Sequence, residues 1–391
     1  MNYGLALEGG GAKGAYQIGV VKALIENGYT FDAIVGTSIG ALNAAMIVEN
    51  RLDKAIDLWS NISYQQMFNL DDKKVDNALQ KNIDIEIIKY FSKKFGKALK
   101  NGGISTENIR KIIVDNVDEN LVRKSKIKFG LLTINLSDRK PEAMFIDDIP
   151  KGELVDYLMA TSSLPVFKRT KIENKSYLDG GAYDNCPVEM LEKLGCKNVI
   201  AIRNYKRMRI RNYKEIVKNN NINLMMIEPY ENLPGILRFD KKNTNALLKL
   251  GYFDGIKFAK KLDGFRYYVL PLDEEVFFNM LSKYDVKELK KIIDFLEIEC
   301  AVGENVRKIL FDEVLALLVS KTSLKKALTY KESVYALLEY VAKSEGVEKY
   351  NIYDFESLLD ITKSKVNLRL KNKTKYEEAI YKFIKHLKYY E

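Results

Sequence analysis

Cysteine and histidine are scarce in this 391-residue sequence, which has three cysteines and a single histidine. The cysteines, Cys186, Cys196 and Cys300, do not have the spacing of a paired metal-binding motif. They are also too few for the disulfide framework of a small secreted protein, so we expect a reducing environment such as the cytosol.

Long apolar runs are missing as well. The first stretch, MNYGLALEGGGAKGAYQ, lacks the basic segment, apolar core and small-residue cleavage site of a secretory signal. No run approaches the roughly 18 apolar residues that a membrane-spanning helix needs. These absences predict a cytoplasmic protein whose contact with membranes is peripheral.

Negative charge is deficient in the first part of the chain. The formal net charge is +10, and basic and acidic residues balance over residues 271–391, so the positive excess lies in residues 1–270. Such a surface attracts anionic partners, either membranes or nucleic acids.

Short apolar runs alternate with helical patterns over the first 270 residues. Strands are expected at residues 3–8, 32–36, 127–135, 199–203, 224–228 and 265–270. Helices are expected at residues 15–27, 38–49, 53–60, 106–114, 151–161, 187–193 and 244–261. This alternation favours an α/β fold in which a mainly parallel central sheet has helices on both faces.

After residue 270 the strand signals fade. Segments 304–320 and 324–343 carry apolar residues at helical spacing on a charged background. We therefore predict two parts, an α/β domain over residues 1–270 and an all-α extension over residues 271–391.

One short motif, GTSIG, carries a candidate nucleophile. It places Ser38 between Gly36 and Gly40, after one apolar run and before another. This pattern is typical of a sharp strand-to-helix turn that presents a nucleophilic serine, with Thr37 completing the turn. A serine hydroxyl is a poor nucleophile until a base removes its proton.

The single histidine is a poor candidate for that base. His386 lies near the end of the chain in the lysine-rich stretch KFIKHLKYYE. A serine–histidine pair would require this tail to fold back into the α/β domain. We interpret His386 as a solvated helix residue, so either another group is the base or Ser38 is not a nucleophile.

The best candidate base is Asp179, in YLDGGAYDNCP. A strand ends just before it, and Gly180 and Gly181 allow a tight turn that leaves the carboxylate facing a crevice. A free aspartate, with a pKa near ~3.9, is a weak base, but shielding from water raises that value. The alternative is a simple Asp-Gly turn.

A glycine-rich loop, LEGGGAKGAYQIG, joins an expected strand to an expected helix. Backbone N–H groups in such a loop can converge on a negative charge, which in acyl transfer is the oxyanion of a tetrahedral intermediate. We assign the donors to Gly10 and Gly11, with the N–H of Ile39 as a further contributor. The rest of the loop comprises Gly9, Ala12, Lys13 and Gly14, of which Lys13 orders the loop or adds positive potential.

The same loop also fits a different function. Gly9, Gly11 and Gly14 match the dinucleotide-binding pattern G-x-G-x-x-G, and Asp32 follows at about the right distance. However, the ribose-binding acid should close the second strand, whereas Asp32 opens it. A dinucleotide-binding oxidoreductase is therefore a distant alternative.

Together, the glycine loop, GTSIG and DGG resemble the patatin-like phospholipases over roughly residues 3–261. The resemblance implies that Ser38 is the nucleophile, that Asp179 is its partner in a two-residue dyad, and that Gly9–Gly14 forms the oxyanion hole. It implies hydrolysis of a lipid acyl ester, of phospholipase A or lysophospholipase type, with no metal or cofactor. ATSSLPVF at 160–167 and the segment 235–255 also look like family segments. The main alternative is a catalytically silent lipid-binding or scaffold protein with the same fold.

A basic segment, RNYKRMRIRNYKEIVK, begins at Arg203. One interpretation is a solvated loop and helix, and the other is a dock for anionic lipid headgroups. Nucleic acid is a less favoured partner because no base-reading module accompanies the segment. The candidate lipid-binding surface consists of Arg203, Lys206, Arg207, Arg209, Arg211 and Lys214.

Overall fold

The computed structural model describes residues 2–72, 75, 103–206, 210–211, 222–299, 305–366 and 373–390. The chain divides into two compact units, Met1–Ala259 (unit 1) and Lys260–Glu391 (unit 2). The position near residue 270, where the sequence pattern changes, lies within unit 2, just after strand β9 (Tyr268–Val269).

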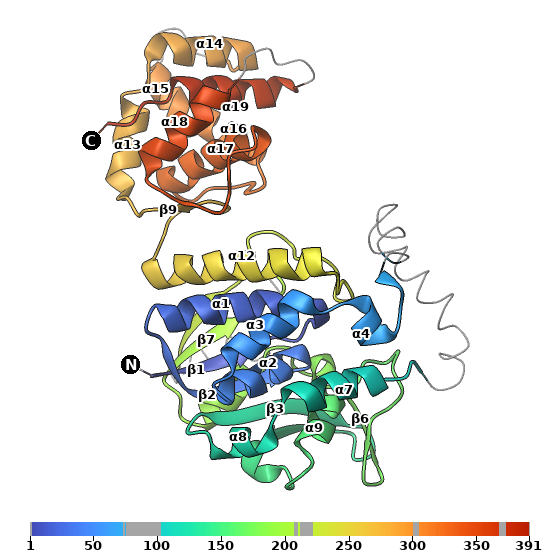
Figure 1. Cartoon of the computed structure of the whole chain (residues 1–391). Coiled ribbons are helices and arrows are strands. Elements are labelled where there is room, and N and C mark those ends of the chain that lie inside the picture. The colour runs from blue at the N-terminus through green and yellow to red at the C-terminus, as the bar shows by residue number, and fades with distance from the viewer. Residues whose placement is uncertain are drawn as a thin grey trace. The chain divides into compact units, whose positions relative to one another are not determined.

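Unit 1 is built around one eight-stranded sheet, shown in Figure 1. Neighbouring strands pair in parallel in the order β3-β2-β1-β7-β8, and their bounds are β1 Asn2–Leu7, β2 Thr30–Thr37, β3 Lys128–Asn135, β7 Asn198–Ile202 and β8 Asn223–Ile227. Antiparallel strands extend the sheet beyond β3, namely β4 Lys140–Phe145, β5 Lys171–Ile172 and β6 Lys175–Asp179. The predicted mainly parallel sheet is confirmed.

Helices cover both faces of this sheet. Alternate residues of a strand point to opposite faces, and Leu5 and Leu7 of β1 belong to one apolar cluster, whereas Ala6 belongs to another. The first cluster includes residues of α1 Gly14–Glu26, α2 Ile39–Val48, α3 Leu52–Asn61, α4 Tyr64–Phe68, α7 Glu107–Asn116, α8 Glu119–Lys124, α9 Leu154–Thr161 and α12 Lys241–Lys260. The second contains residues of α10 Val188–Lys193. The result is the predicted three-layer α/β/α arrangement.

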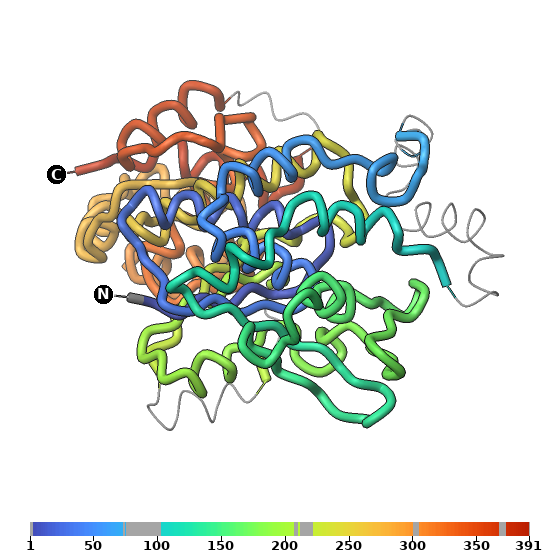
Figure 2. The backbone as a smooth tube through the Cα atoms, turned by 60° about the horizontal axis from the view of Figure 1, so that its bottom comes forward, coloured from blue at the N-terminus to red at the C-terminus, as the bar shows by residue number. Residues whose placement is uncertain are grey.

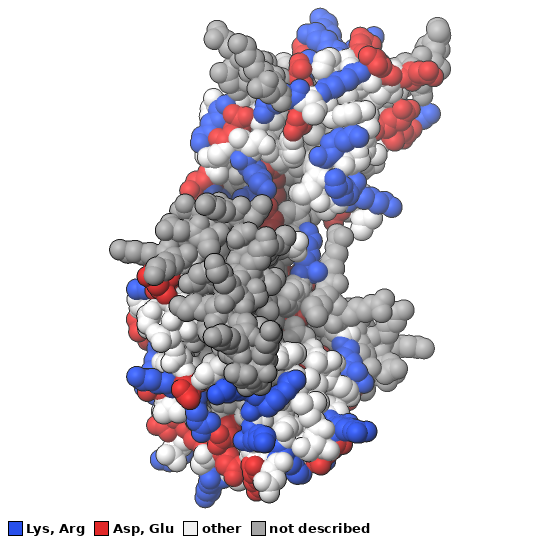
Figure 3. Space-filling model, turned by 90° about the vertical axis from the view of Figure 1, so that its right-hand side faces the viewer, with Lys and Arg blue, Asp and Glu red and all other residues white. Residues whose placement is uncertain are grey.

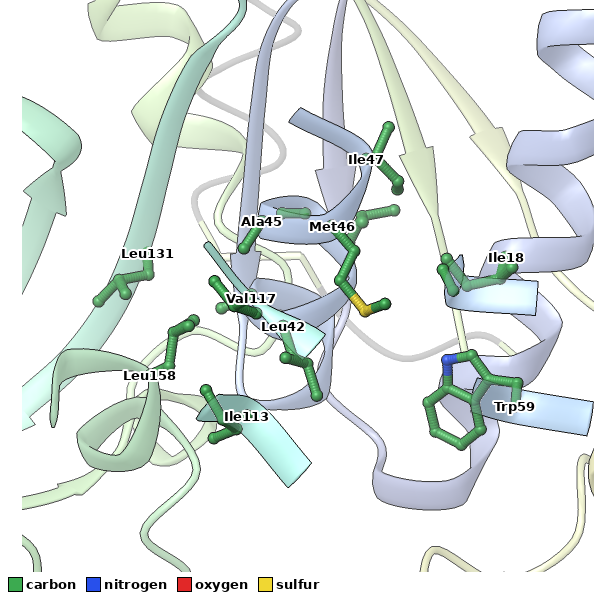
Figure 4. Packing of buried hydrophobic residues seen from close by; sticks show 14 of the residues in the cluster. Ile18, Leu42, Ala45, Met46, Ile47, Trp59, Ile113, Val117, Leu131 and Leu158 are labelled. Atoms are coloured by element: carbon green, nitrogen blue, oxygen red, sulfur yellow. The ribbon is translucent and has the colours of Figure 1, made fainter. Parts of the chain in front are cut away.

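Helix α2 lies at the centre of the larger cluster. Its residues from Gly40 to Val48 are all buried, as expected for a helix that is apolar nearly all round. Figure 4 shows it among side chains from several other elements, with Ile18 and Trp59 to one side of Leu42, Ala45, Met46 and Ile47, and Ile113, Val117, Leu131 and Leu158 to the other. The helix that follows Ser38 is therefore fixed on all sides.

Helix α12 packs unusually closely on α1, and the two lie side by side in Figures 1 and 2. A Cβ atom at Gly19 would lie 2.1 Å from the carbonyl oxygen of Leu248, and one at Gly251 would lie 2.0 Å from that of Tyr16. Only glycine fits at these contacts. They hold the chain before α12 in place, so that the carbonyl of Ile236 accepts a hydrogen bond of 2.8 Å from Ala12 in the glycine loop.

Unit 2 is largely helical, as predicted, and has its own apolar core. Its helices are α13 Glu274–Ser282, α14 Val286–Leu296, α15 Val306–Ile309, the π-helical turn η4 Leu310–Val314, α16 Leu315–Ser320, α17 Tyr330–Ser344, α18 Phe355–Lys365 and α19 Lys375–His386. A short parallel pair joins β9 to β10 (Ile352–Tyr353). Within the described residues of both units, we find no helix with the length and apolar character needed to cross a membrane.

Candidate active site

Ser38 occupies a strained turn between β2 and α2. Its backbone has φ 55° and ψ −126°, a conformation that L-residues rarely adopt. A Cβ at Gly36 would lie 2.3 Å from the carbonyl carbon of Gly40, and one at Gly40 would lie 2.3 Å from the carbonyl oxygen of Leu7. Gly36 therefore lets β2 pass close to α2, and Gly40 lets α2 pass close to the end of β1, which is the reason for the GTSIG pattern.

Asp179 is the last residue of β6 and reaches the same place from the other side of β3. In the sheet, Thr37 lies opposite Leu132 and Asp179 lies opposite Thr133. β6 runs antiparallel to β3. Asp179 therefore reaches the site because of how β6 is aligned with β3, and not because β6 is a parallel strand that ends beside β2. A Cβ at Gly180 would lie 2.1 Å from the carbonyl oxygen of Leu132, so the turn after Asp179 requires glycine.

The two side chains lie close together. Both line one cavity, an interaction with the Ser38 side chain lowers the pKa of Asp179, and the Asp179 carboxylate accepts the N–H of Gly181 at 2.7 Å. Asp179 is therefore both the acceptor of an Asp-Gly turn and the partner of Ser38. Burial raises the pKa of Asp179 to about 6, and the hydrogen bond from Gly181 and the interaction with Ser38 partly oppose that rise. The carboxylate is a stronger base than a free aspartate yet is still largely ionised at neutral pH.

The glycine loop presents free backbone donors beside this pair. Gly9 N–H donates to the carbonyl of Asn185 at 2.9 Å, and the N–H of Ala12 is held by Ile236. Across the described ranges, by contrast, the N–H groups of Gly10 and Gly11 have no acceptor. Gly11 has φ 55°, and a Cβ there would lie 2.2 Å from the Ile236 carbonyl oxygen. Ile39 begins α2, so its N–H is one of the unpaired donors of a helix start.

Other parts of the loop stabilise it. Lys13 is buried, and its ammonium lies 3.6 Å from the centre of the Tyr205 ring, a cation–π contact. Gly14 packs on α3, because a Cβ there would lie 2.6 Å from the Trp59 ring. The backbone N–H of Ser38 donates to the Thr161 hydroxyl at 2.9 Å, which anchors the serine turn on α9.

Ser38, Asp179, Gly10, Gly11 and Ile39 all line one cavity of about 240 Å³. Its remaining walls are mostly apolar and come from α2, α3, α4, α7 and two loops, residues 162–167 and 236–239. The segment after β6, including Asn185, and Tyr205 complete the lining. Aromatic side chains dominate one region, where Phe239 stacks on Trp59 and contacts Phe68 edge-on. The sequence does not reveal these walls, because they are assembled from short segments far apart in the chain. The two loops lie within segments 160–167 and 235–255, which resemble segments of the patatin-like phospholipases.

The structure also places His386, Cys186 and Asp32. His386 ends α19 in unit 2, where its Nε2 lies 3.5 Å from a carboxylate oxygen of Glu288. Cys186 is buried, and burial raises the pKa of its thiol well above the usual value, while Cys300 lies outside the described residues. Asp32 is exposed near the start of β2, at the opposite end of that strand from Ser38. The part of the chain that the structure describes contains no group of three or more acidic, histidine or cysteine side chains suited to a metal ion.

The candidate lipid-binding surface needs one correction. Arg203 is 1% exposed, and its guanidinium forms a buried ion pair of 3.0 Å with Glu8, so its assignment to a headgroup-binding surface is wrong. Lys206 and Arg211 remain candidates, with Lys206 beside the ring of Tyr230 and Arg211 stacked on that of Tyr183. The other members, Arg207, Arg209 and Lys214, lie outside the described residues.

The fold and site define an α/β protein in which a serine and a buried carboxylate meet beside a glycine loop. A family model described as patatin-like phospholipase matches residues 5–192, a range that holds the loop, Ser38 and Asp179. Over this range the chain is similar to the patatin-like phospholipases, in agreement with the sequence resemblance.

Individual relatives are distant. The patatin-like phospholipase domain-containing protein ZK370.4 of Caenorhabditis elegans is 24% identical over 275 residues, covering 69% of this chain and 18% of that protein. The patatin-like phospholipase domain-containing protein 7 of Rattus norvegicus is 28% identical over 201 residues, covering 51% of this chain and 13% of that protein. The chain thus spans less than a fifth of the length of these relatives. Among solved structures, VipD from Legionella pneumophila is 14% identical, with a TM-score of 0.42 over 98% of this chain and 90% of that chain.

Proposed function

We propose that unit 1 is a lipid acyl hydrolase of the phospholipase A or lysophospholipase type. The observation that carries this proposal is that Ser38 and the buried Asp179 carboxylate lie together at the wall of one apolar cavity. An apolar cavity accepts a fatty acyl chain at little cost, because the chain leaves water for surroundings as apolar as itself. The family match supports the same class of reaction.

In the proposed mechanism, Ser38 Oγ attacks the ester carbonyl carbon while its proton passes to Asp179. The negative charge that develops on the carbonyl oxygen is stabilised by the N–H groups of Gly10 and Gly11, and by that of Ile39. Collapse of this intermediate expels the alcohol part of the lipid, which takes the proton back from Asp179. Water then attacks the acyl-serine in the same way, with Asp179 as base, and releases the fatty acid.

A fluorophosphonate probe tests the proposal and separates it from the alternative of a silent lipid-binding protein. Such probes react only with an activated serine, so we expect one covalent adduct per chain, located on Ser38 by peptide mass spectrometry. Hydrolysis of a short acyl ester should disappear in step with labelling. An intact protein that binds lipid vesicles but is neither labelled nor active would favour the lipid-binding alternative.

A second prediction concerns the lipid surface. On the face drawn in Figure 3, basic side chains are interspersed with acidic ones, so a headgroup dock has to be a local cluster. Each basic residue at an anionic membrane contributes about 1 kcal/mol. The double variant Lys206→Glu/Arg211→Glu removes about 2 kcal/mol and adds repulsion, so we expect its affinity for anionic vesicles to fall by at least about 30-fold.

The matched control for this sedimentation assay is Lys140→Glu/Lys193→Glu, which changes the net charge equally at two other exposed lysines of unit 1. It should bind anionic vesicles nearly as the unmodified protein does. Equal losses in both double variants would mean that net charge, and not this surface, governs binding.

A further inference from the structure

Two asparagine side chains hold the carbonyl of Gly9, the residue before the first free donor of the glycine loop. The Asn185 amide donates to Gly9 O at 3.2 Å, and the Asn204 amide donates to the same oxygen at 3.3 Å and to Glu8 O at 2.9 Å. Asn185 also accepts the N–H of Gly9 on its own carbonyl, at 2.9 Å. The loop is thus held from two sides by segments that follow β6 and β7.

The glycines of the loop make room for these amides. A Cβ at Gly9 would lie 2.5 Å from Asn185 Oδ1, and one at Gly10 would lie 2.8 Å from Asn204 Nδ2. Asn185 Oδ1 would also lie 2.6 Å from a Cβ at Gly181, in the turn that carries Asp179. Asn185 therefore packs against both the glycine loop and the Asp179 turn.

The orientation of a peptide unit links this clamp to the chemistry. In a trans peptide, the C=O of one residue and the N–H of the next lie in one plane and point in opposite directions. Fixing Gly9 C=O against the two amides therefore fixes the direction of Gly10 N–H. We propose that Asn185 and Asn204 are positioning residues that aim the Gly10 N–H at the oxyanion; this inference rests on the proposed function.

The surroundings of Asn204 support a dedicated role. Its side chain is fully buried, and its Oδ1 has no hydrogen-bond partner among the described residues, while Nδ2 serves two carbonyls. Turning the amide over would place Oδ1 against those two oxygens, so the donor must face the loop. The fold thus tolerates an unpaired buried oxygen in order to keep this donor in place.

A buried ion pair holds Asn204 in turn. The Glu8 carboxylate accepts the N–H of Asn204 at 2.5 Å and that of Tyr205 at 3.2 Å, and pairs with the Arg203 guanidinium. Glu8 is also the residue just before Gly9. The segment that supplies the clamp and the loop that it clamps are therefore tied together at adjacent residues.

The test compares Asn185→Ala and Asn204→Ala with Asn135→Ala, a buried asparagine whose amide bonds to Asp138 and Glu142 at the end of β3. Loss of a whole oxyanion donor typically costs about 10²- to 10³-fold in kcat. Misdirecting one should lower kcat about 10-fold or more on a short acyl ester, with KM little changed. The control should keep its kcat even where its unfolding temperature falls.

A second readout isolates the oxyanion. An acyl trifluoromethyl ketone is attacked by Ser38 Oγ and becomes an oxyanion, whereas a fatty alcohol of the same length carries no negative charge. We expect the ketone to bind about 10-fold more weakly to each variant and the alcohol to bind unchanged. A variant that only loosened the fold would bind both the ketone and the alcohol more weakly.

The outcomes are distinguishable. Folded Asn185→Ala and Asn204→Ala proteins with unchanged kcat and ketone affinity would overturn the inference while leaving the esterase proposal intact. If Asn204→Ala does not fold, Asn185→Ala, whose side chain is only half-buried, decides the question alone. An unmodified protein without ester hydrolysis or labelling would instead overturn the proposed function, and this inference with it.

Discussion

Replacement of Ser38 by alanine is expected to abolish ester hydrolysis while leaving unit 1 folded. Removal of the nucleophile in a serine hydrolase lowers kcat on the order of 10⁶-fold. The turn itself should survive, because its close contacts are made by Gly36 and Gly40 and its backbone anchor runs from Ser38 N–H to Thr161. None of these contacts uses the serine hydroxyl.

The measurement is the rate of hydrolysis of a short acyl ester, together with the thermal unfolding temperature. A suitable control is Ser137→Ala, since Ser137 is an exposed serine on the loop after β3. It should retain full activity. Substantial turnover by a folded Ser38→Ala protein would show that another group attacks the ester, and it would remove the basis of the proposed mechanism.

The motifs could be predicted from sequence because each reflects a local backbone requirement. GTSIG marks a turn in which two glycines let backbone segments pass close to one another. The glycine loop marks a stretch in which a side chain would collide with neighbouring residues of the fold. The parallel strands were equally visible, since strands buried on both faces are continuous apolar runs. In contrast, the sequence does not indicate β4, because KPEAMF contains a proline and charged residues and has only intermediate or exposed positions.

What the sequence could not supply is the set of partners across the fold. Arg203 resembles part of a basic surface in the sequence, and only the sheet shows that it faces Glu8, the residue just after the neighbouring strand β1. Asn204 has no motif of its own. Its position just after β7 was the available signal, because ligand sites lie at the carboxyl ends of parallel strands.

The second large effect is expected from Asp179→Asn, which should lose activity and gain stability. Loss of a general base lowers the rate about 10²- to 10⁴-fold, and asparagine cannot take the proton of Ser38. In the unmodified protein, kcat/KM should rise with pH up to about pH 6 and then level off, as Asp179 ionises with its pKa of about 6. The variant should lack this step.

Although Asp179→Asn should lower activity, it should raise the free energy of unfolding. The pKa of Asp179 is raised from 3.8 to about 6 on folding, so the folded state binds the proton more tightly than the unfolded state. Stability is then highest when the group is protonated and falls as pH rises from about 4 to 6. The ionised carboxylate costs about 3 kcal/mol of folding free energy at neutral pH, and asparagine avoids this cost.

Chemical denaturation of both proteins at pH 4 and pH 7 measures the effect. Burial raises the pKa of Asp184 to about 6 as well, so only the difference between the two proteins isolates Asp179. We expect the variant to be more stable by about 3 kcal/mol at pH 7, with little difference at pH 4. A variant that is less stable at pH 7 would mean that the carboxylate is held for its contacts with Gly181 and Ser38. One that is active at pH 7 would show that Asp179 is not the base.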